Sequence, residues 1–258
     1  MTTIPSPLFD VRGRVALVTG SSRGIGSVLA RGLAQAGARV AINGRDPQAV
    51  ADTCAMLEKS GCDVCAAAFD VTSPDGVAAG IDRIEEWVGP IDILVNNAGI
   101  QRRAHFTEFT DQDWTDLLAS NLTSAFLVGR RVAASMERRG SGKVINIGSV
   151  QSMLGRPGIA AYAATKGAIA MLTKGMCADL APRGIQVNSI APGYFATELT
   201  QALVDDPEFS RWVQQRTPAG RWGRVEDLVG ALLFLASPAS DFVNGQVIYV
   251  DGGMTAVV

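Results

Sequence analysis

Three side chains able to do chemistry follow one another between residues 146 and 166. Ser149 stands just after the apolar run Lys143–Ile147, and Tyr162 and Lys166 lie in an alanine-rich segment, 160–180. That segment is predicted to be a helix, so Tyr162 and Lys166, four residues apart, share one of its faces. The run before Ser149 is predicted to be a buried β-strand, and ligands bind at the carboxyl ends of parallel strands. A hydroxyl, a phenol and an ammonium are therefore expected to converge on one spot.

The elements that must position these side chains alternate along the chain. Apolar, strand-like runs recur between helical patterns, at residues 14–19, 39–43, 64–69, 91–95, 143–147, 185–190 and 246–250. Near-continuous apolar strands that alternate with helices are typical of a parallel sheet covered on both faces. The pattern predicts an α/β protein: a single-domain Rossmann fold over residues 1–258, with a doubly wound parallel sheet of about seven strands and helices on both faces.

Two stretches do not follow this simple alternation. Residues 1–12 are expected to form a short arm, and residues 194–224 are expected to be irregular and polar. The second stretch is long for a plain connection, which predicts a substrate lid. Asp111 opens a long helix that carries Asn121 and is expected to continue to Arg139.

Composition excludes several classes of function. The chain has 258 residues, of which 47% are hydrophobic, and its net charge is −2. A nucleic-acid or anionic-membrane surface needs a basic excess, so neither partner is expected. The single histidine, His105, excludes a multi-histidine metal site, and no metal is expected. The start of the chain has no apolar region typical of a signal peptide. The CxxC of Cys62 and Cys65 enters a strand-like run, so these cysteines are expected to be reduced thiols, and the protein is expected to be cytoplasmic.

A glycine-rich turn follows the first predicted strand and opens a helix. Gly20, Gly24 and Gly26 have GxxxGxG spacing, which lets the backbone turn sharply and approach a pyrophosphate at a helix N-terminus. Such turns are common, so the prediction of a dinucleotide site depends on this placement between strand and helix.

The end of the second predicted strand indicates which dinucleotide would bind. It reads Asn43-Gly44-Arg45, without the acid that would bind a ribose 2′-hydroxyl, and Asp46 is better interpreted as a helix cap. Arg45, together with Arg23 of the glycine turn, would instead pair with a 2′-phosphate, so NADP(H) is preferred over NAD(H). The alternative is that both arginines are ordinary surface charges. Asp70 ends the third strand, where its carboxylate could accept an adenine amino proton or serve as a turn residue.

The motifs together resemble the short-chain dehydrogenase/reductase family over nearly the whole chain. They stand in order as Thr19-Gly-x-x-x-Gly24-Ile-Gly26, Asn96-Asn-Ala-Gly99, Asn121, Ser149, Tyr162-x-x-x-Lys166 and Pro192-Gly193. The resemblance implies a hydride-transfer enzyme with Ser149, Tyr162, Lys166 and Asn121 as its catalytic residues. It also implies homotetramers in which the helices carrying Asn121 and Tyr162 pack between subunits.

The resemblance assigns a role to each of these residues. Tyr162 would be the general acid/base, and since a free phenol has a pKa near ~10, Lys166 and the positive charge of the nicotinamide would lower that pKa. Ser149 would hydrogen-bond the reacting oxygen, and Asn121 would kink its helix and hold a water that relays the proton. Lys166 would also hold the nicotinamide ribose, Asn97 would be a structural post beside it, and Thr197 would contact the carboxamide. The complete expected cofactor set is Gly20, Ser22, Arg23, Gly24, Ile25, Gly26, Asn43, Arg45, Asp70, Val71, Asn97, Ala98, Gly99, Tyr162, Lys166, Pro192, Gly193 and Thr197.

Three further stretches resemble the members of this family that interconvert gluconate and its 5-keto form. These are residues 96–103, 191–199 and 217–223. A small sugar acid fits the chemistry, because arginine binds carboxylates through a planar two-point fork. The expected substrate residues are Arg102, Arg103, Gln151, Arg156 and Tyr194, although each arginine could equally face solvent or a neighbouring subunit. The alternatives are a 3-oxoacyl carrier-protein reductase, another polyol or sugar dehydrogenase, and a non-catalytic cofactor-binding protein.

Overall fold

A computed structural model describes residues 7–258 of the protein. Seven parallel strands form one sheet through the middle of the molecule. The strands are β1 (Val15–Val18), β2 (Arg39–Gly44), β3 (Val64–Ala68), β4 (Ile93–Asn96), β5 (Gly142–Ile147), β6 (Ile185–Pro192) and β7 (Val247–Val250). Their order in the sheet is β3-β2-β1-β4-β5-β6-β7, and every neighbouring pair is parallel. The order reverses between β1 and β4, which opens a crevice at the carboxyl edge of the sheet.

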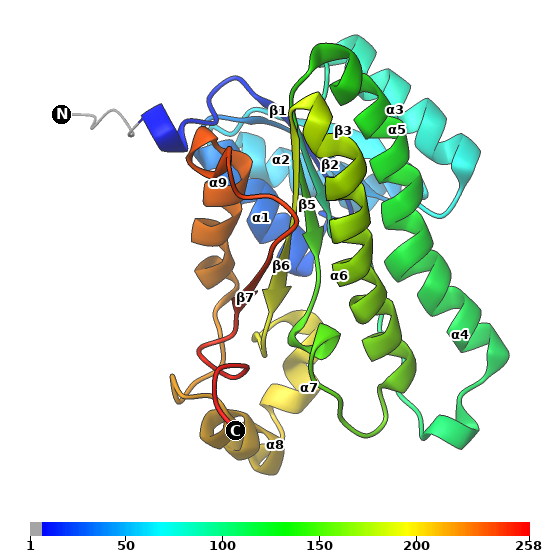
Figure 1. The fold of residues 1–258 in the computed structure, drawn as a ribbon, viewed down its shortest axis with the longest axis vertical. Coiled ribbons are helices and arrows are strands. Elements are labelled where there is room, and N and C mark those ends of the chain that lie inside the picture. The colour runs from blue at the N-terminus through cyan, green and yellow to red at the C-terminus, as the bar shows by residue number, and fades with distance from the viewer. Residues whose placement is uncertain (1–6) are drawn as a thin grey trace.

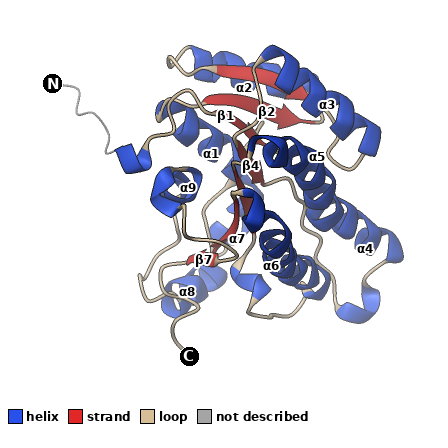
Figure 2. Cartoon of the chain, turned by 45° about the horizontal axis from the view of Figure 1, so that its top comes forward, coloured by secondary structure: helices blue, strands red, loops and turns tan. Residues whose placement is uncertain are grey.

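Helices cover both faces of the sheet (Figures 1 and 2). One apolar core lies beneath α1 (Gly24–Gln35), α2 (Pro47–Glu58) and α9 (Val229–Ala236). The other lies beneath α3 (Pro74–Trp87), α5 (Ser124–Arg139) and α6 (Ala160–Leu180). β1 supplies both cores, because Ala16 and Val18 point to the first and Val15 and Leu17 to the second, as the two-residue period of a strand requires. This doubly wound α/β fold confirms the fold class predicted from the sequence.

Local capping explains where several helices begin. The Asp46 carboxylate accepts hydrogen bonds from the backbone of Gln48 and Ala49, and Pro47 occupies the first turn of α2. The Ser73 hydroxyl accepts from Gly76 N at the start of α3 in the same way. Both residues satisfy backbone donors that a helix N-terminus leaves unpaired. The cap expected at Asp46 is therefore confirmed.

The helix expected from Asp111 to Arg139 is interrupted. Its first part is α4 (Asp111–Leu118) and its second is α5, and a π-helical turn at Ala119–Thr123 joins them. Single π-helical turns inside α-helices are often found at functional sites, and this one contains Asn121.

The prediction that residues 194–224 are irregular was wrong. This stretch holds a 3-10 turn at Glu198–Thr200, a short α7 (Gln201–Val204) and α8 (Pro207–Arg216). Asp206 caps α8 through the backbone of Glu208 and Phe209. Turn residues such as Pro207 and Gly220 hid this helix within a polar sequence. The remaining 3-10 turns are Pro7–Phe9, Phe106–Glu108, Val150–Ser152, Ala181–Arg183, Val225–Leu228 and Pro238–Ser240.

Half of the arm expected at 1–12, residues 1–6, lies outside the described residues. Within residues 7–258, every helix is too short or too polar to cross a membrane.

Candidate active site

The glycine turn forms a cradle at the N-terminus of α1. Gly20 has a positive φ of 61°, and a Cβ atom on Gly26 would collide with the carbonyl oxygen of Gly20. Arg23 is the N-cap of α1 but its side chain makes no capping hydrogen bond, so the first-turn N–H groups are left for a ligand. A helix N-terminus with free N–H donors suits an anion such as a pyrophosphate. The residues present therefore fit a dinucleotide.

Asn97 holds this cradle against the end of β4. Its Nδ2 donates to the carbonyl oxygens of Thr19 at 2.9 Å and Gly20 at 3.1 Å. In return, the Thr19 hydroxyl accepts hydrogen bonds from the backbone of Asn97 and Ala98. These contacts match the structural post expected at Asn97.

The end of β2 carries two different kinds of polar group. The buried Asn43 side chain is used within the fold, because its Nδ2 donates to the carbonyls of Ala67 and Phe69 and its Oδ1 accepts from Gly20 N. Arg45 is exposed at the same end, as is Arg23 across the cavity. Within residues 7–258, neither arginine forms an ion pair with a carboxylate. Both cations are therefore available to an anionic ligand.

Asp70 follows β3 and is held by its neighbour Thr72. Burial by itself would raise the pKa of the Asp70 carboxyl, but hydrogen bonds from Thr72 and the Arg45 charge lower it below its usual range. The carboxylate is thus an ionised acceptor that lies close to Arg45.

Ser149, Tyr162 and Lys166 come together where β5 meets α6, as the sequence predicted. The Ser149 hydroxyl accepts a 3.1 Å hydrogen bond from Gln151 N, which turns the loop after β5. The Lys166 ammonium lies 5.8 Å from the centre of the Tyr162 ring and donates a 2.7 Å hydrogen bond to the carbonyl of Ile147. The phenol, the hydroxyl and the ammonium all line one cavity.

In the protein without its cofactor, the pKa of Tyr162 is not lowered; the expected lowering involved Lys166 and a bound nicotinamide together. Burial raises the pKa of the Tyr162 phenol, although Ser149 and Arg103 act in the opposite direction. Burial also lowers the pKa of Lys166 to about 8. Desolvation penalises the charged form of each group, so without a bound ligand Lys166 does not bring the phenol below its ordinary pKa.

Asn121 ties the π-helical turn to both sides of the site. Its Oδ1 accepts from Ile100 N at 2.7 Å, and its Nδ2 donates to the Ile100 carbonyl at 2.9 Å and to the Thr165 hydroxyl at 3.2 Å. Thr165 in turn donates a 2.8 Å hydrogen bond to the carbonyl of Tyr162. A continuous chain of bonds thus runs from the loop after β4 to the first turn of α6.

The far end of the cavity gathers groups that suit a polar anion. Arg156 Nε, Tyr194 Oη and Gln151 Oε1 are buried and lack hydrogen-bond partners within residues 7–258. Arg103 and Arg156 both line this cavity, and partial burial together with the Arg156 charge lowers the pKa of Arg103. Buried polar atoms normally have partners, which makes these three atoms candidates for contact with a ligand. Arg102 is already partly engaged, because its Nε donates to Asp113 at 3.1 Å.

One cavity of about 660 Å³ contains all of the site residues predicted from the sequence, including Val71, Gly99, Pro192, Gly193 and Thr197. This volume is typical of a small-molecule site. The Thr197 hydroxyl is occupied in a capping box with Thr200, so any contact with a ligand must share that bond.

Sequence reasoning missed several residues that line the same cavity. Ile100 and Ile159 had no signal beyond being apolar, and Glu198 and Leu203 lie in the stretch that had been expected to be irregular. Tertiary folding alone brings these side chains to the site.

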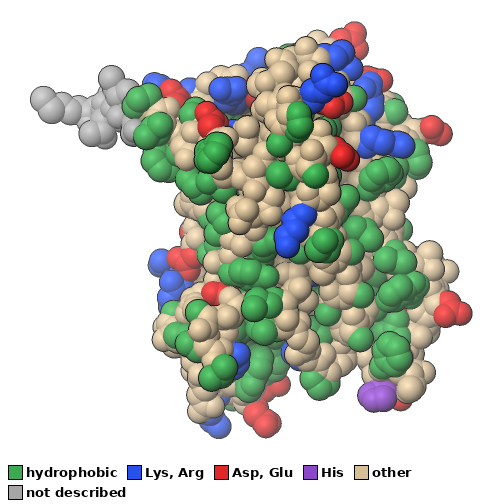
Figure 3. Space-filling view, viewed as in Figure 1, with side chains coloured by type: hydrophobic (Ala, Val, Ile, Leu, Met, Phe, Trp, Pro, Cys, Tyr) green, Lys and Arg blue, Asp and Glu red, His purple; other side chains and the backbone are tan. Residues whose placement is uncertain are grey.

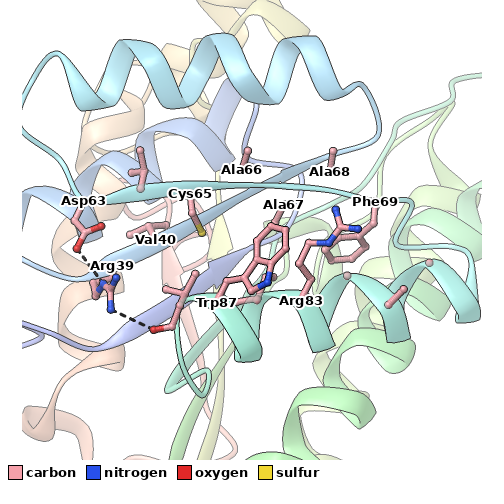
Figure 4. A pocket seen from close by; sticks show the side chains of 16 residues that line it. Arg39, Val40, Asp63, Cys65, Ala66, Ala67, Ala68, Phe69, Arg83 and Trp87 are labelled. Atoms are coloured by element: carbon pink, nitrogen blue, oxygen red, sulfur yellow. Dashed lines mark hydrogen bonds and ion pairs between the residues drawn. The ribbon is translucent and has the colours of Figure 1, made fainter.

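A second cavity, of about 460 Å³, lies at the outer edge of the sheet and shares Phe69 with the first (Figure 4). It separates β3 from α3, and Arg83 stacks over the Trp87 ring on one of its walls. Arg39 and Asp63 pair with each other at its end. None of its unpartnered polar groups is buried, so no ligand is indicated there. Cys65 lines this cavity, whereas Cys62 packs in the core on the other face of the sheet. Both are free thiols, and burial raises the pKa of Cys65, which favours its unreactive form.

The comparisons with known proteins agree with this geometry. Residues 20–255 match a family model described as enoyl-(acyl carrier protein) reductase. The chain is 56% identical over 248 residues to a gluconate 5-dehydrogenase of Gluconobacter oxydans, covering 96% of this chain and 97% of the relative. It is 52% identical over 251 residues to a 5-keto-D-gluconate 5-reductase of Escherichia coli, covering 97% and 99%.

A solved structure is similar over its full length. The gluconate 5-dehydrogenase from Burkholderia cenocepacia, solved in complex with NADP and tartrate, superposes with a TM-score of 0.95. The two sequences are 57% identical, and the match covers 98% of this chain and 99% of that one. The glycine cradle and the Ser149–Tyr162–Lys166 group agree with these relatives. These relatives show that the chain belongs to the short-chain dehydrogenase/reductase family and is an oxidoreductase.

Proposed function

We propose that this enzyme interconverts D-gluconate and 5-keto-D-gluconate with NADP(H) as the hydride carrier. The observation that carries the proposal is the pair Arg103 and Arg156, with three unpartnered polar atoms, in the same cavity as Tyr162 and Ser149. A sugar acid presents a carboxylate and several hydroxyls, which match guanidinium, phenol and amide groups. The names of the relatives from Gluconobacter oxydans and Escherichia coli support the same substrate.

The preference for NADP(H) rests on charge at the end of β2. Arg45 and Arg23 are exposed and lie beside the cavity, where a 2′-phosphate would pair with them. Asp46, the nearest acid in sequence, is occupied with the backbone of Gln48 and Ala49. Its carboxylate is thus committed to capping α2 rather than to binding a ribose 2′-hydroxyl.

The reaction divides between the bound dinucleotide and the side chains. When bound, NADP(H) supplies the hydride acceptor or donor. In the oxidation direction, Tyr162 Oη takes the proton from the C5 hydroxyl while the C5 hydride leaves with its electron pair. Ser149 donates a hydrogen bond to the same oxygen, and Lys166 and Asn121 hold the proton path that leads outward. In the reduction direction, Tyr162 returns the proton to the oxygen.

The pKa of Tyr162 must fall for the oxidation to proceed near neutral pH. In the protein without cofactor, burial raises the pKa of Tyr162. The positive charge of an oxidised nicotinamide opposes this effect of burial. The base is therefore assembled only once the cofactor is present, which favours ordered binding with the cofactor first.

Two structural roles complete the proposal. Residues 194–224, which include α7 and α8, act as the substrate lid, since Tyr194, Glu198 and Leu203 line the cavity from this segment.

The enzyme assembles as a homotetramer through α5 and α6. Phe126 and Met171 are 46% and 63% exposed on these helices, and Figure 3 shows apolar side chains spread over the face that they form. Ala163, Ala164, Gly167, Ala168 and Ala170 allow close helix approach there.

A steady-state comparison of substrates tests this proposal. D-gluconate, sorbitol as a neutral polyol, and acetoacetyl thioester would be assayed with NADP(H) and with NAD(H). The expected result is the highest kcat/KM with gluconate and NADP. Rapid thioester reduction without gluconate oxidation would instead indicate a 3-oxoacyl carrier-protein reductase.

A further inference from the structure

Arg156 contacts an aromatic ring from a distant part of the chain. It lies in the loop between Ser149 and Tyr162, and its guanidinium carbon is 5.2 Å from the centre of the Phe209 ring. Phe209 belongs to α8. This distance is within the range of a cation–π interaction, which is stronger where the cation is partly withdrawn from water.

The Phe209 ring is itself fixed by other rings. Tyr194 packs edge-on against Phe209, Trp212 and Trp222, with ring centres 5.8, 5.5 and 5.9 Å away. Phe209 also contacts Trp212 at 5.4 Å and Trp222 at 6.2 Å. The Trp222 indole donates a 3.1 Å hydrogen bond to Ser210 Oγ on the same helix. A packed four-ring cluster thus forms a rigid surface beneath Arg156.

Stacking on a ring uses the face of a guanidinium and leaves its edge free. The N–H donors lie in the guanidinium plane, where a carboxylate binds, so a ring below does not compete with an anion at the edge. Arg156 Nε is buried without a partner, and within residues 7–258 Arg156 forms no ion pair. Tyr194 Oη comes from the same cluster and lies beside Arg156: burial raises the pKa of this phenol, and the Arg156 charge opposes that rise.

We propose that Phe209 is a positioning residue for substrate recognition: its ring holds Arg156 with its donor edge directed at the carboxylate of the sugar acid. This inference rests on the proposed function and adds a residue that lies outside the cavity lining. Leucine at position 209 would fill similar apolar space without a π face, so Arg156 would sample other orientations. Affinity for an anionic substrate falls as a result, while hydride transfer from bound substrate continues.

The test compares Phe209→Leu with Phe209→Tyr and Trp212→Leu. Phe209→Leu is expected to raise KM for gluconate about three- to tenfold, with kcat changed less than twofold and NADPH affinity unchanged. Phe209→Tyr keeps the ring face and is expected to retain the wild-type KM. Trp212→Leu removes one of the rings that fix Phe209 but keeps the Phe209 ring face under Arg156, so it is expected to lower thermal stability and to raise KM clearly less than Phe209→Leu does.

A double-mutant cycle with Arg156→Gln shows whether Phe209 acts through Arg156. The expected result is that Phe209→Leu adds little to the KM of the Arg156→Gln enzyme. Additive effects, or an equal rise of KM in Phe209→Leu and Trp212→Leu, would overturn the inference.

Calorimetric binding of D-gluconate to the same variants separates this inference from the proposed function. A wild-type enzyme that binds gluconate but does not oxidise it would contradict the proposed function alone. The affinities of the Phe209 and Arg156 variants would then decide the inference, and a wild-type enzyme that binds no gluconate would overturn both.

Discussion

The ammonium of Lys166 donates a 2.7 Å hydrogen bond to the carbonyl oxygen of Ile147, the last residue of β5. This bond ties helix α6 to β5, the strand that leads into Ser149. It also holds the ammonium in a buried position, 6% exposed, where burial lowers its pKa to about 8. The group that organises the site therefore costs folding free energy whenever it is charged.

A dependence of stability on pH follows from this relationship. The folded protein loses the Lys166 proton near pH 8, whereas the unfolded chain keeps it to about pH 10.5. Between these values the unfolded state binds more protons, so the free energy of unfolding is expected to rise with pH, by about 1.4 kcal/mol per unit from this group. Lys166→Met should lack that component. Urea unfolding of both proteins at pH 7.5, 8.5 and 9.5 measures this difference. The same change of unfolding free energy with pH in wild type and Lys166→Met would count against a buried charge at Lys166.

Tyr162 is expected to control the pH dependence of turnover. Burial raises its pKa and an oxidised nicotinamide opposes that rise, so kcat for oxidation should increase with pH until the phenol of the cofactor complex is ionised, while kcat for reduction falls over the same range. Tyr162→Phe should lower kcat in both directions by about 10³-fold or more while NADPH still binds. Rate profiles from pH 6 to 10, with fluorescence titration of NADPH, measure both effects. A fully active Tyr162→Phe enzyme would remove Tyr162 from the mechanism.

Arg45 is expected to distinguish the two nicotinamide cofactors. Arg45→Ala should raise KM for NADP roughly 10- to 100-fold, because charge-assisted hydrogen bonds to the 2′-phosphate are lost, and should leave KM for NAD nearly unchanged. Arg31→Ala is a matched control, because Arg31 is on α1 but pairs with Glu226 at 3.0 Å. Equal losses with NADP and NAD would show that Arg45 does not contact a 2′-phosphate.

Thr165 is expected to fix the position of Tyr162 through the backbone. Ile159 makes no side-chain cap at the start of α6, so the bond from Thr165 to the Tyr162 carbonyl and its link to Asn121 steady the first turn. Thr165→Val keeps the shape but removes both bonds, and kcat is expected to fall about tenfold or more, with NADPH affinity unchanged. Thr165→Ser should restore kcat. A valine enzyme as active as wild type would show that this chain of bonds is not needed.

Motifs that are local in the sequence predicted much of the fold and the site. Strand runs such as residues 143–147 and the helix at 160–180 carry their own periodicity, and the spacing of Tyr162 and Lys166 follows from helix geometry. The glycine turn was predicted from the local spacing of its glycines. The structure gives the physical reason for one of them, because Gly26 leaves no room for a Cβ atom.

Features that depend on distant contacts were not predicted. A kink at Asn121 was expected, but not the π-helical turn that forms there, which is held by Ile100, twenty-one residues away. Helix α8 was not predicted either, because it begins inside a stretch rich in turn residues. The pairing of Arg102 with Asp113 and the upward pKa shift of Tyr162 depend on which groups folding brings close. Side-chain environment, unlike periodicity, is set by the complete fold.

The product formed from D-gluconate and NADP identifies the carbon that this enzyme oxidises. NMR of the reaction mixture is expected to show 5-keto-D-gluconate accumulating in step with NADPH, with none formed by Tyr162→Phe. Oxidation at another carbon, or no NADPH formation at any pH from 7 to 10, would exclude the proposed reaction at C5.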